Sequence, residues 1–356
     1  MTNNVLITGA GGFIGGSIAA DFLSSSSPVL QKAHIIAAVR SSDHVAAWAK
    51  LGVDAVQVDL SDENVVTQTV LEYEVNIVIH TASAMNWDLA KNLITALGKQ
   101  KESSGQQTNF IHTSGTGAFY PNTGWPAGDF SDTDDVFGTE TRLADSFPIR
   151  QTDVNVVEYS KALGVSSYIV VPTITYGKGT GPWNQLSVIF PPYVSAAIAQ
   201  KAVYKFPENT KISGVHISDL TALYSLVLAA ILQGKQIEHG EKGYYFGIAH
   251  PLHWHDLAKH LAVALKARGL VTSDEPQVWS SAEEAAEPLG VPAAFVQALW
   301  NSGDNIITHN QERIGWEPTW TAEKFYARID DEIDAVVELG KAKSSLIDSL
   351  HAAARG

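Results

Sequence analysis

The sequence predicts an α/β fold in which helices cover both faces of a doubly wound parallel sheet and a smaller α/β lobe follows. An apolar run at the start of the chain ends in a glycine cluster, within residues 5–16. Apolar runs and helical patterns then alternate as far as Pro172, which is typical of parallel strands joined by helices. The pattern changes after Pro172. We therefore expect a first lobe over residues 1–175 and a substrate-binding lobe over residues 176–356, with the chain free to cross between them.

The composition excludes several classes of protein. The chain has 356 residues, of which 45% are hydrophobic and 17% charged, so it has enough apolar residues for a large core. A formal net charge of -14 argues against a nucleic-acid surface. Cysteine is absent, which excludes disulfides and thiolate chemistry. The first strand leaves no room for a signal peptide, and no apolar run is long enough to cross a bilayer. We expect a cytoplasmic protein without a membrane partner.

The glycine cluster has the spacing G-x-x-G-x-x-G between a predicted strand and a predicted helix. In this context the chain turns sharply, bare backbone approaches a diphosphate, and the helix packs close to the sheet. The free N–H groups at the start of the helix also favour an anion. We expect a dinucleotide to bind here, at Gly9, Gly12, Phe13, Ile14 and Gly15. The alternative is a purely structural glycine turn.

A second predicted strand, residues 34–39, ends at Arg40. In a dinucleotide-binding fold this end meets the adenosine ribose, where a carboxylate selects NAD(H) and an arginine accommodates the 2′-phosphate of NADP(H). Here the nearest acid, Asp43, comes three positions later. The sequence therefore favours NADP(H) over NAD(H). The alternative is an ordinary solvated arginine.

The next two predicted strands also end in candidate cofactor residues. Residues 54–60 end in Asp59 and Leu60, which we expect beside the adenine. An N-cap for the following helix is the alternative role of Asp59. Residues 76–84 are apolar, as expected of a buried parallel strand, and end in small residues. These small residues, which would let the cofactor lie close, are Thr81, Ala82 and Ser83.

A fifth predicted strand with its exit loop covers residues 108–117, including the cofactor candidate Thr113, after a helix at 86–104. Residues 119–150 then form an acidic stretch rich in proline and glycine, which predicts a long loop at the carboxyl edge of the sheet. This loop is either a lid over the site or an ordinary solvent-exposed loop. A helix near 152–163 and a sixth strand lead to Pro172, the last cofactor candidate.

The rest of the chain is expected to be mainly helical. A glycine-rich loop carries Trp183, and helices are predicted near 193–201 and 220–232. A strand is predicted at 243–248, and the final helix carries lysines at positions 341 and 343.

Two groups of residues carry weaker hypotheses. The histidines between His250 and His255 lack the spacing of metal ligands, so no metal is expected. Several aromatic residues fall in or near the predicted site loops and either line an apolar pocket or fill the core. They are Trp87, Trp125, Trp183, Phe190 and Tyr193.

Taken in order, the motifs resemble those of an extended-type short-chain dehydrogenase/reductase, the superfamily that includes NAD(P)-dependent epimerases and dehydratases. The matching features are the glycine motif at Gly9, Asp59-Leu60, the small residues 81–84, residues 172–177 (Pro-Thr-Ile-Thr-Tyr-Gly) and residues 216–220 (His-Ile-Ser-Asp-Leu). The resemblance implies a Rossmann sheet, a nicotinamide cofactor and an enzyme.

The chain departs from that family at the catalytic residues. The family uses a Tyr-x-x-x-Lys pair, in which lysine lowers the pKa of the tyrosine, and a Ser or Thr after strand five. No tyrosine here has a lysine four positions later. The usual spacing places the pair between Asp145 and Arg150, whereas Tyr159 and Lys161 are two apart and lie too far along the helix. Gly115 stands where the serine usually lies.

We therefore expect an NADP(H)-dependent reductase or dehydrogenase with a non-standard proton relay. The catalytic candidates are Ser114, Thr116 and Arg150. The expected substrate is a small hydrophobic or aromatic molecule, whose hydroxyl or carbonyl group reacts. The expected assembly, if the protein associates, is a homodimer. The alternatives are a non-redox isomerase, cyclase or lyase, and a regulatory protein that senses the cofactor.

Overall fold

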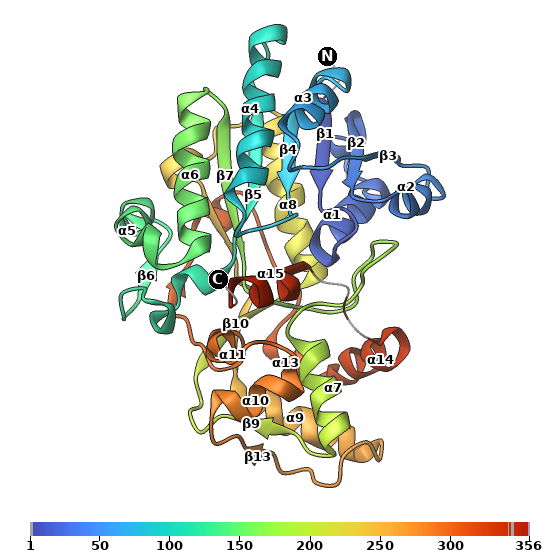
Figure 1. Ribbon diagram of the computed structural model, residues 1–356, viewed down its shortest axis with the longest axis vertical. Helices are drawn as coiled ribbons and strands as arrows, with labels where there is room; N and C mark the ends of the chain where they lie inside the picture. Colours follow the sequence, from blue (N-terminus) through green and yellow to red (C-terminus); the bar gives the residue numbers. More distant parts are fainter. Residues whose placement is uncertain (1–2, 341, 343–344, 355–356) are drawn as a thin grey trace.

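Seven parallel strands form the central sheet, in the order β11-β7-β5-β4-β1-β2-β3 (Figure 1). The computed structural model describes residues 3–340, 342 and 345–354. The strands are β1 (Asn3–Thr8), β2 (Ala33–Val39), β3 (Asp54–Gln57), β4 (Val75–His80), β5 (Asn109–Thr113), β7 (Ser166–Pro172) and β11 (Tyr244–Gly247). The order places β1 and β4 side by side at the centre, so the topology reverses direction there. The predicted doubly wound fold is confirmed.

Helices cover both faces of this sheet, and their buried side chains form a separate core on each face. One face is covered by α1 (Phe13–Ser24), α2 (Ser42–Ala49) and α8 (Ile217–Leu232). The other is covered by α3 (Glu63–Glu72), α4 (Trp87–Ser104) and α6 (Pro148–Ala162). The central strands are buried on both faces because helices pack on each, which explains their continuous apolar sequence.

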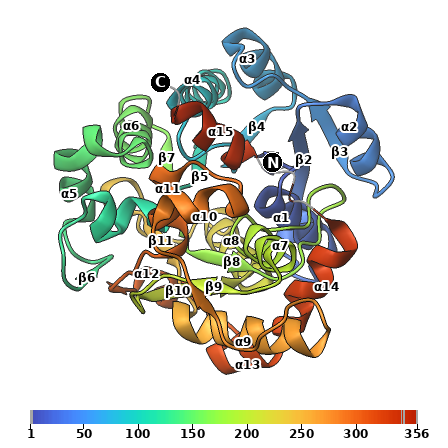
Figure 2. The same cartoon turned by 60° about the horizontal axis from the view of Figure 1, so that its bottom comes forward.

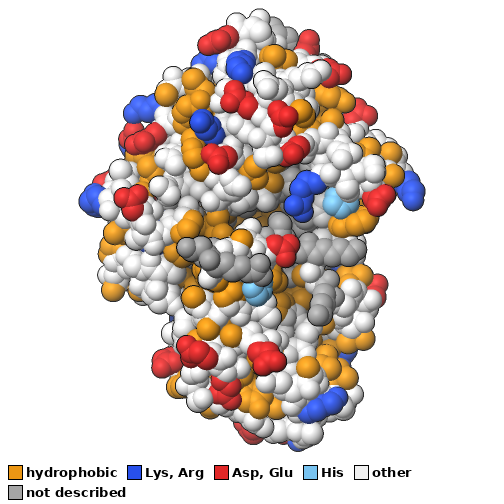
Figure 3. Space-filling view, viewed as in Figure 1, with side chains coloured by type: hydrophobic (Ala, Val, Ile, Leu, Met, Phe, Trp, Pro, Cys, Tyr) orange, Lys and Arg blue, Asp and Glu red, His pale blue; other side chains and the backbone are white. Residues whose placement is uncertain are grey.

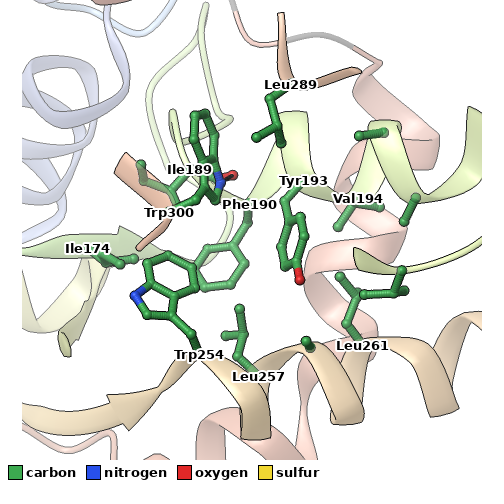
Figure 4. Packing of buried hydrophobic residues seen from close by; sticks show 14 of the residues in the cluster. Ile174, Ile189, Phe190, Tyr193, Val194, Trp254, Leu257, Leu261, Leu289 and Trp300 are labelled. Carbon is green, nitrogen blue, oxygen red and sulfur yellow. Dashed lines mark hydrogen bonds between the residues drawn. The ribbon is translucent and has the colours of Figure 1, made fainter. Parts of the chain in front are cut away.

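The second lobe lies below the carboxyl ends of the strands in Figure 1. Its helices are α7 (Phe190–Gln200), α9 (Trp254–Ala267), α10 (Ala282–Leu289), α11 (Ala293–Trp300), α13 (Ala322–Ala327) and α14 (Ile329–Leu339). A three-stranded sheet joins β8 (Ile174–Tyr176), β10 (Lys211–His216) and β12 (His250–His253), and a two-stranded sheet joins β9 (Tyr204–Lys205) and β13 (Gln277–Val278). Aromatic side chains, among them Phe190, Tyr193 and Trp254, fill the core between α7 and α9 (Figure 4).

The chain returns to the first lobe after it has entered the second. β11 pairs with β7 in the main sheet, and α8 packs on that sheet beside α1. A short helix, α12 (Asn310–Arg313), packs on β11. The two lobes are therefore not consecutive ranges of sequence.

The stretch 119–150 is folded and packed, so the expectation of a long open loop is wrong. It contains β6 (Phe130–Ser131), α5 (Val136–Leu143) and two 3-10 turns (Pro121–Thr123 and Ala144–Ser146), and β6 pairs with β14 (Ile306–Ile307). Glu140 and Arg150 in or beside this stretch are fully buried. The acidic composition led us to expect solvent contact, whereas a buried carboxyl and a buried guanidinium hold the segment in place.

The last described helix, α15 (Ser345–Ala353), lies at the waist between the lobes (Figures 1 and 2). Leu350 is buried, Ile347 packs against the second-lobe core, and His351 Nε2 lies 3.2 Å from the carbonyl oxygen of Gly290. The lysines expected on the final helix, at 341 and 343, lie outside the described residues. No helix in the described ranges has both the length and the apolarity needed to span a membrane.

A buried carboxyl joins α14 to the turn that follows β8. Glu332 Oε1 accepts a 2.6 Å hydrogen bond from the backbone N–H of Gly177, a residue at φ +89°. Burial, which this single hydrogen bond only partly offsets, raises the pKa of Glu332 to about 7.

The folded protein should therefore lose stability as pH rises through this range. The folded state binds the Glu332 proton more tightly than the unfolded state, whose carboxyl titrates near 4.5, so the free energy of unfolding falls between about pH 4.5 and 7. At about 1.4 kcal/mol per pKa unit the loss reaches ~3 kcal/mol. We expect Glu332→Gln to keep the acceptor and remove this decline. Urea unfolding of both proteins at pH 5 and pH 8 measures it, and an equal decline in the two would contradict the assignment.

Candidate functional site

The glycine turn between β1 and α1 presents bare backbone at the centre of the sheet. Gly9 has φ +73°, a conformation that favours glycine, and accepts a 2.8 Å hydrogen bond from the N–H of Gly12. Gly12 is the N-cap of α1, and no side chain in the described part of the chain caps it. The first N–H groups of the helix are thus directed at the turn with the positive end of the helix dipole behind them.

There is no space for side chains at two of the glycines. A Cβ on Gly15 would lie 2.3 Å from Thr81 Oγ1 and 2.6 Å from the carbonyl oxygen of Gly9. A Cβ on Gly9 would lie 2.6 Å from the same Thr81 oxygen. Thr81 is fixed because its hydroxyl donates a 2.7 Å hydrogen bond to the carbonyl of Thr8. Helix, turn and the end of β4 are therefore in direct contact, and this cradle fits the diphosphate of a dinucleotide.

The other predicted residues of the turn support its shape. Phe13 is buried, and Ile14 packs against the core beneath α1. A loop from the second lobe lies against the start of the same helix, since a Cβ on Gly181 would lie 2.8 Å from Cα of Gly16. In that loop Trp183 packs edge-on against the ring of His44, with ring centroids 4.2 Å apart.

The adenosine side contains the predicted Arg40, Asp59 and Leu60. Arg40 is exposed directly after β2, and its carbonyl accepts a hydrogen bond from Gln57. β3 ends at Gln57, three residues earlier than expected. The Asp59 carboxylate accepts from Ser61 N–H and Oγ, which lowers the pKa of Asp59. The N-cap of α3 is Asp62, not Asp59.

The remaining cofactor candidates lie at the ends of β4, β5 and β7. Ala82 N is 2.8 Å from the Cβ position of Gly9, and the Ser83 hydroxyl accepts from the N–H groups of Met85 and Asn86, just before α4. Pro172 is the last, buried residue of β7. The Thr113 hydroxyl lies 2.6 Å from that of Tyr224 on α8, so its side chain is used for packing between sheet and helix.

The exit loop of β5 carries the two hydroxyl candidates. Ser114 Oγ donates a 2.5 Å hydrogen bond to Asp153 Oδ2 of α6. Thr116 Oγ1 lies 2.7 Å from the phenol oxygen of Tyr120. Burial raises the pKa of Tyr120, and the nearby Asp304 raises it further, so this phenol stays a neutral hydrogen-bonding group. Between the two hydroxyls is Gly115, whose Cβ position has a single neighbour within 4 Å among the described residues.

A set of buried ionisable groups lies directly behind Ser114. Asp153, Glu140 and His112 are all 0% exposed. His112 Nε2 is 3.3 Å from Asp153 Oδ1, and Glu140 Oε2 accepts a 2.5 Å hydrogen bond from the phenol of Tyr244. Burial, and then repulsion from Asp153, raise the pKa of Glu140 well above its usual value.

Arg150, the third catalytic candidate, is occupied by structural contacts. Its Nε donates a 2.6 Å hydrogen bond to the carbonyl of Ala118, and its Nη atoms donate hydrogen bonds to Thr123 and Ser146. The guanidinium also lies against the rings of Trp125 and Phe147. It anchors the segment after β5 from the inside, and these contacts take up its donors.

The position of the family's tyrosine and lysine holds neither residue type. α6 begins at Pro148, and Ile149 Cδ1 is the atom 3.9 Å from the Cβ position of Gly115. Tyr159 hydrogen-bonds Thr95, and Lys161 pairs with Glu241 at the exposed end of α6. An apolar side chain therefore faces the exit loop where the family places its proton relay.

The predicted aromatic residues do not gather in one pocket. Trp87 contacts Tyr159, and Trp125 contacts Phe119 and Phe130. Phe190 and Tyr193 belong to the second-lobe core, as the core-filling alternative expected (Figure 4). In the described part of the chain no group of three His, Cys, Asp or Glu side chains is placed to hold a metal ion.

A separate hollow of about 410 Å³ lies in the second lobe beside Gly177, walled by Tyr176, His216 and Trp320. Two of its cations are paired with acids, Lys178 with Glu338 and Arg328 with Asp331. It contains none of the residues of the glycine turn or of the β5 exit loop.

Sequence reasoning missed Glu140 as a site residue, whereas Asp153 lies in the helix that the sequence predicts near 152–163. Glu140 lies in the acidic stretch, where Asp129, Asp134, Asp135 and Asp145 are exposed. The sequence contained one signal for Asp153. It is an aspartate among the apolar positions of α6, on the face that packs against the sheet.

The cradle makes a prediction for Gly15. We expect Gly15→Ala to raise the dissociation constant for NADPH at least about tenfold, which corresponds to ~1.4 kcal/mol, because the methyl group must displace Thr81 or the Gly9 carbonyl. Calorimetric titration measures the constant, and a circular dichroism melt checks the fold. Ser24→Ala, at the exposed end of the same helix, is the control. Unchanged NADPH affinity in a folded Gly15→Ala protein would refute the cradle.

Comparison with known proteins agrees with this geometry. The model of the NAD dependent epimerase/dehydratase family matches residues 5–240. A search of curated protein sequences gives no significant match.

Solved structures show the same fold at low sequence identity. The UDP-glucose 4-epimerase of Thermotoga maritima, solved with UDP-glucose, aligns with a TM-score of 0.61 at 14% identity over 95% of this chain and 100% of its own. The dTDP-glucose 4,6-dehydratase of Bacillus anthracis, solved with NAD, aligns with a TM-score of 0.64 at 13% identity over 94% and 97% of the two chains. The family match covers more than half of the chain, includes the glycine turn and the exit loop of β5, and ends before β11. This protein belongs to the NAD dependent epimerase/dehydratase family.

Proposed function

We propose that the protein is an NADP(H)-dependent oxidoreductase that acts on a hydroxyl or carbonyl group of a small hydrophobic molecule. One observation carries the proposal. The bare-backbone cradle at Gly9 and Gly15 opens at the same edge of the sheet as the polar exit loop of β5, with Ser114 and Thr116. In open α/β sheets this carboxyl edge, where the strand order reverses, is the ligand-binding edge.

The cradle is built for a bound dinucleotide, and a bound nicotinamide supplies or accepts a hydride. The chain itself has to hold the substrate oxygen and move its proton. Ser114 and the Thr116–Tyr120 pair present three hydroxyl groups within a short segment, and the open space over Gly115 leaves room beside them for a substrate. A hydroxyl held by such groups is oriented for hydride exchange.

The charges near the site support a small uncharged substrate. Arg150 uses its donors on the backbone and hydroxyls of its own loop, and Lys178 is paired with Glu338. A phosphorylated sugar nucleotide requires free cations or backbone donors beyond those that hold the cofactor. Hydrophobic side chains are also prominent at the waist between the lobes, whereas most visible charged side chains lie above and below it (Figure 3).

Arg40 supports NADP(H) as the cofactor. It is exposed at the end of β2, and no described acidic side chain lies within ion-pair distance of it. A free guanidinium at this position suits a phosphate on the ribose.

A non-redox isomerase, cyclase or lyase is the second candidate, and Ile149 is the observation that favours it. An apolar side chain facing the exit loop removes the family's way of lowering the pKa of a phenol. Such a non-redox enzyme can accelerate its reaction by holding the substrate in a reactive orientation, without a phenol of lowered pKa.

The experiment that separates these candidates follows nicotinamide absorbance. Acetophenone and related ketones are supplied with NADPH, and 1-phenylethanol and related alcohols with NADP⁺. UDP-glucose and dTDP-glucose with NAD⁺ form the comparison arm. We expect redox turnover in the first two arms. Tight NADPH binding with substrate conversion and constant absorbance would overturn the oxidoreductase in favour of the second candidate.

The cofactor preference makes its own prediction. We expect the wild type to bind NADP⁺ more tightly than NAD⁺, and Arg40→Ala to weaken NADP⁺ at least about tenfold because a charge-assisted contact is lost. NAD⁺ affinity should change little. Lys50→Ala, an exposed cation at the far end of α2, is the control, and tighter binding of NAD⁺ by the wild type would contradict the preference.

A further inference from the structure

The hollow beside Gly177 in the second lobe has a half-satisfied carboxyl group in its wall. Glu332 is 6% exposed and lines this hollow, whose volume is about 410 Å³. Its Oε1 accepts the hydrogen bond from the N–H of Gly177, whereas its Oε2 receives no hydrogen bond from the described residues. Buried polar groups in proteins are almost always paired. An unpaired carboxyl oxygen in the wall of a cavity therefore points to a donor that the described chain does not supply.

The charge of Glu332 is also the one that the hollow leaves uncompensated. The hollow is lined by three other acids of α14, and each of them is paired with a cation: Asp331 with Arg328, Asp334 with Arg268, and Glu338 with Lys178. In the described part of the chain no cation lies within ion-pair distance of Glu332. Because the neighbouring cations are already in use, an ionised Glu332 favours a ligand that brings a positive charge. The same pairing leaves no cation for an anionic ligand.

Aromatic side chains form another part of the wall. Tyr176 and Phe325 are each 1% exposed and pack together, with ring centroids 4.4 Å apart. His216 stacks on Trp320 with ring centroids 3.9 Å apart. Burial lowers the pKa of His216 to about 4, so this imidazole is neutral at neutral pH and does not repel a cation. A ligand in the hollow thus meets aromatic surface and one carboxylate, a combination that suits an ammonium group on an apolar body.

We propose that this hollow is a binding site for a small organic ammonium compound with an apolar or aromatic body, whose N–H groups donate to Glu332 Oε2. The site goes beyond the oxidoreductase function, because it contains no residue of the glycine turn or of the β5 exit loop. A cavity of about 410 Å³ takes a small molecule rather than a bare ion. Among the described side chains no group of three possible ligands is placed to hold a metal ion, which also favours an organic cation.

A proton on Glu332 competes with such a ligand. Burial raises the pKa of Glu332 to about 7, so the carboxyl is mostly neutral at pH 5 and mostly ionised at pH 8. Only the ionised carboxylate attracts an ammonium group, so the affinity should rise with pH. The other charged or titratable groups around Glu332 are the three paired acids of α14 with their cations, His216, Tyr176, Lys324 beside Trp320, and Asp219 near His216.

Calorimetric titration with benzylammonium tests the site, and benzyl alcohol, which has the same ring without the charge, is the matched probe. We expect the wild type at pH 8 to bind benzylammonium at least about tenfold more tightly than benzyl alcohol, and at least about tenfold more tightly than it does at pH 5. Glu332→Gln keeps an acceptor for the N–H of Gly177 and should stay folded, which a circular dichroism melt checks. It should weaken benzylammonium at least about tenfold at pH 8 and remove the dependence on pH.

Glu338→Gln is the control for general electrostatics, because it removes the same charge from the same helix and the same hollow. Its affinity for benzylammonium should stay within about threefold of the wild type, as expected for an exposed, paired acid. Saturating NADPH should not displace the ligand. Equal losses in Glu332→Gln and Glu338→Gln, equal binding of benzyl alcohol, displacement by NADPH, or no binding of benzylammonium by the wild type would overturn the proposal. No readout depends on turnover, so a failure of the oxidoreductase function leaves this test unchanged.

Discussion

The structure depends on the contact between the glycine turn and the end of β4. With Gly15 and Gly9 both against Thr81, α1 begins as close to the sheet as backbone permits. That approach fixes where the positive end of the helix points and leaves main-chain N–H groups, rather than side chains, as the recognition surface. It explains how a chain with a net charge of -14 forms a site for an anionic cofactor. Local backbone donors, and not the overall charge, set the potential at the turn.

Much of the first lobe could be predicted because its signals are local. The glycine spacing, the apolar strands and the absence of a lysine four positions after any tyrosine are visible in short windows of sequence. Two other features depend on contacts between distant residues. β11 joins β7 from far along the chain, and the acidic stretch becomes packed because Arg150 and Glu140 are buried together. Composition predicts solvent contact for such a segment, and only tertiary structure shows which charges are compensated inside.

The residues of the candidate site also fall into two groups: those that local sequence predicts and those that only contacts between distant residues reveal. Residues at strand ends, such as Ser114 and Thr81, have positions that the fold fixes, so sequence order was enough to find them. Arg150 was predicted as a catalytic candidate, and its contacts are those of an anchor for the loop after β5. Glu140 was missed because nothing in its neighbourhood of sequence distinguishes a buried carboxyl from a solvated one. Glu140 thus comes from a stretch that the sequence predicted as a lid or a solvated loop, whereas Asp153 and His112 come from a predicted helix and a predicted strand.

The return of the chain to the first lobe has a consequence for how the molecule avoids self-association. β11 covers β7 along its parallel register, from Tyr244 beside Ile169 to Gly247 beside Pro172. If β11 were released, β7 would become an apolar strand with unpaired backbone groups, open to pairing with the same strand of a neighbouring molecule. Because β7 ends at Pro172 and β11 begins only at Tyr244, a nascent chain keeps that edge uncovered until well over half of the protein has been made. Aggregation during synthesis, rather than in the finished fold, is the risk that this topology carries.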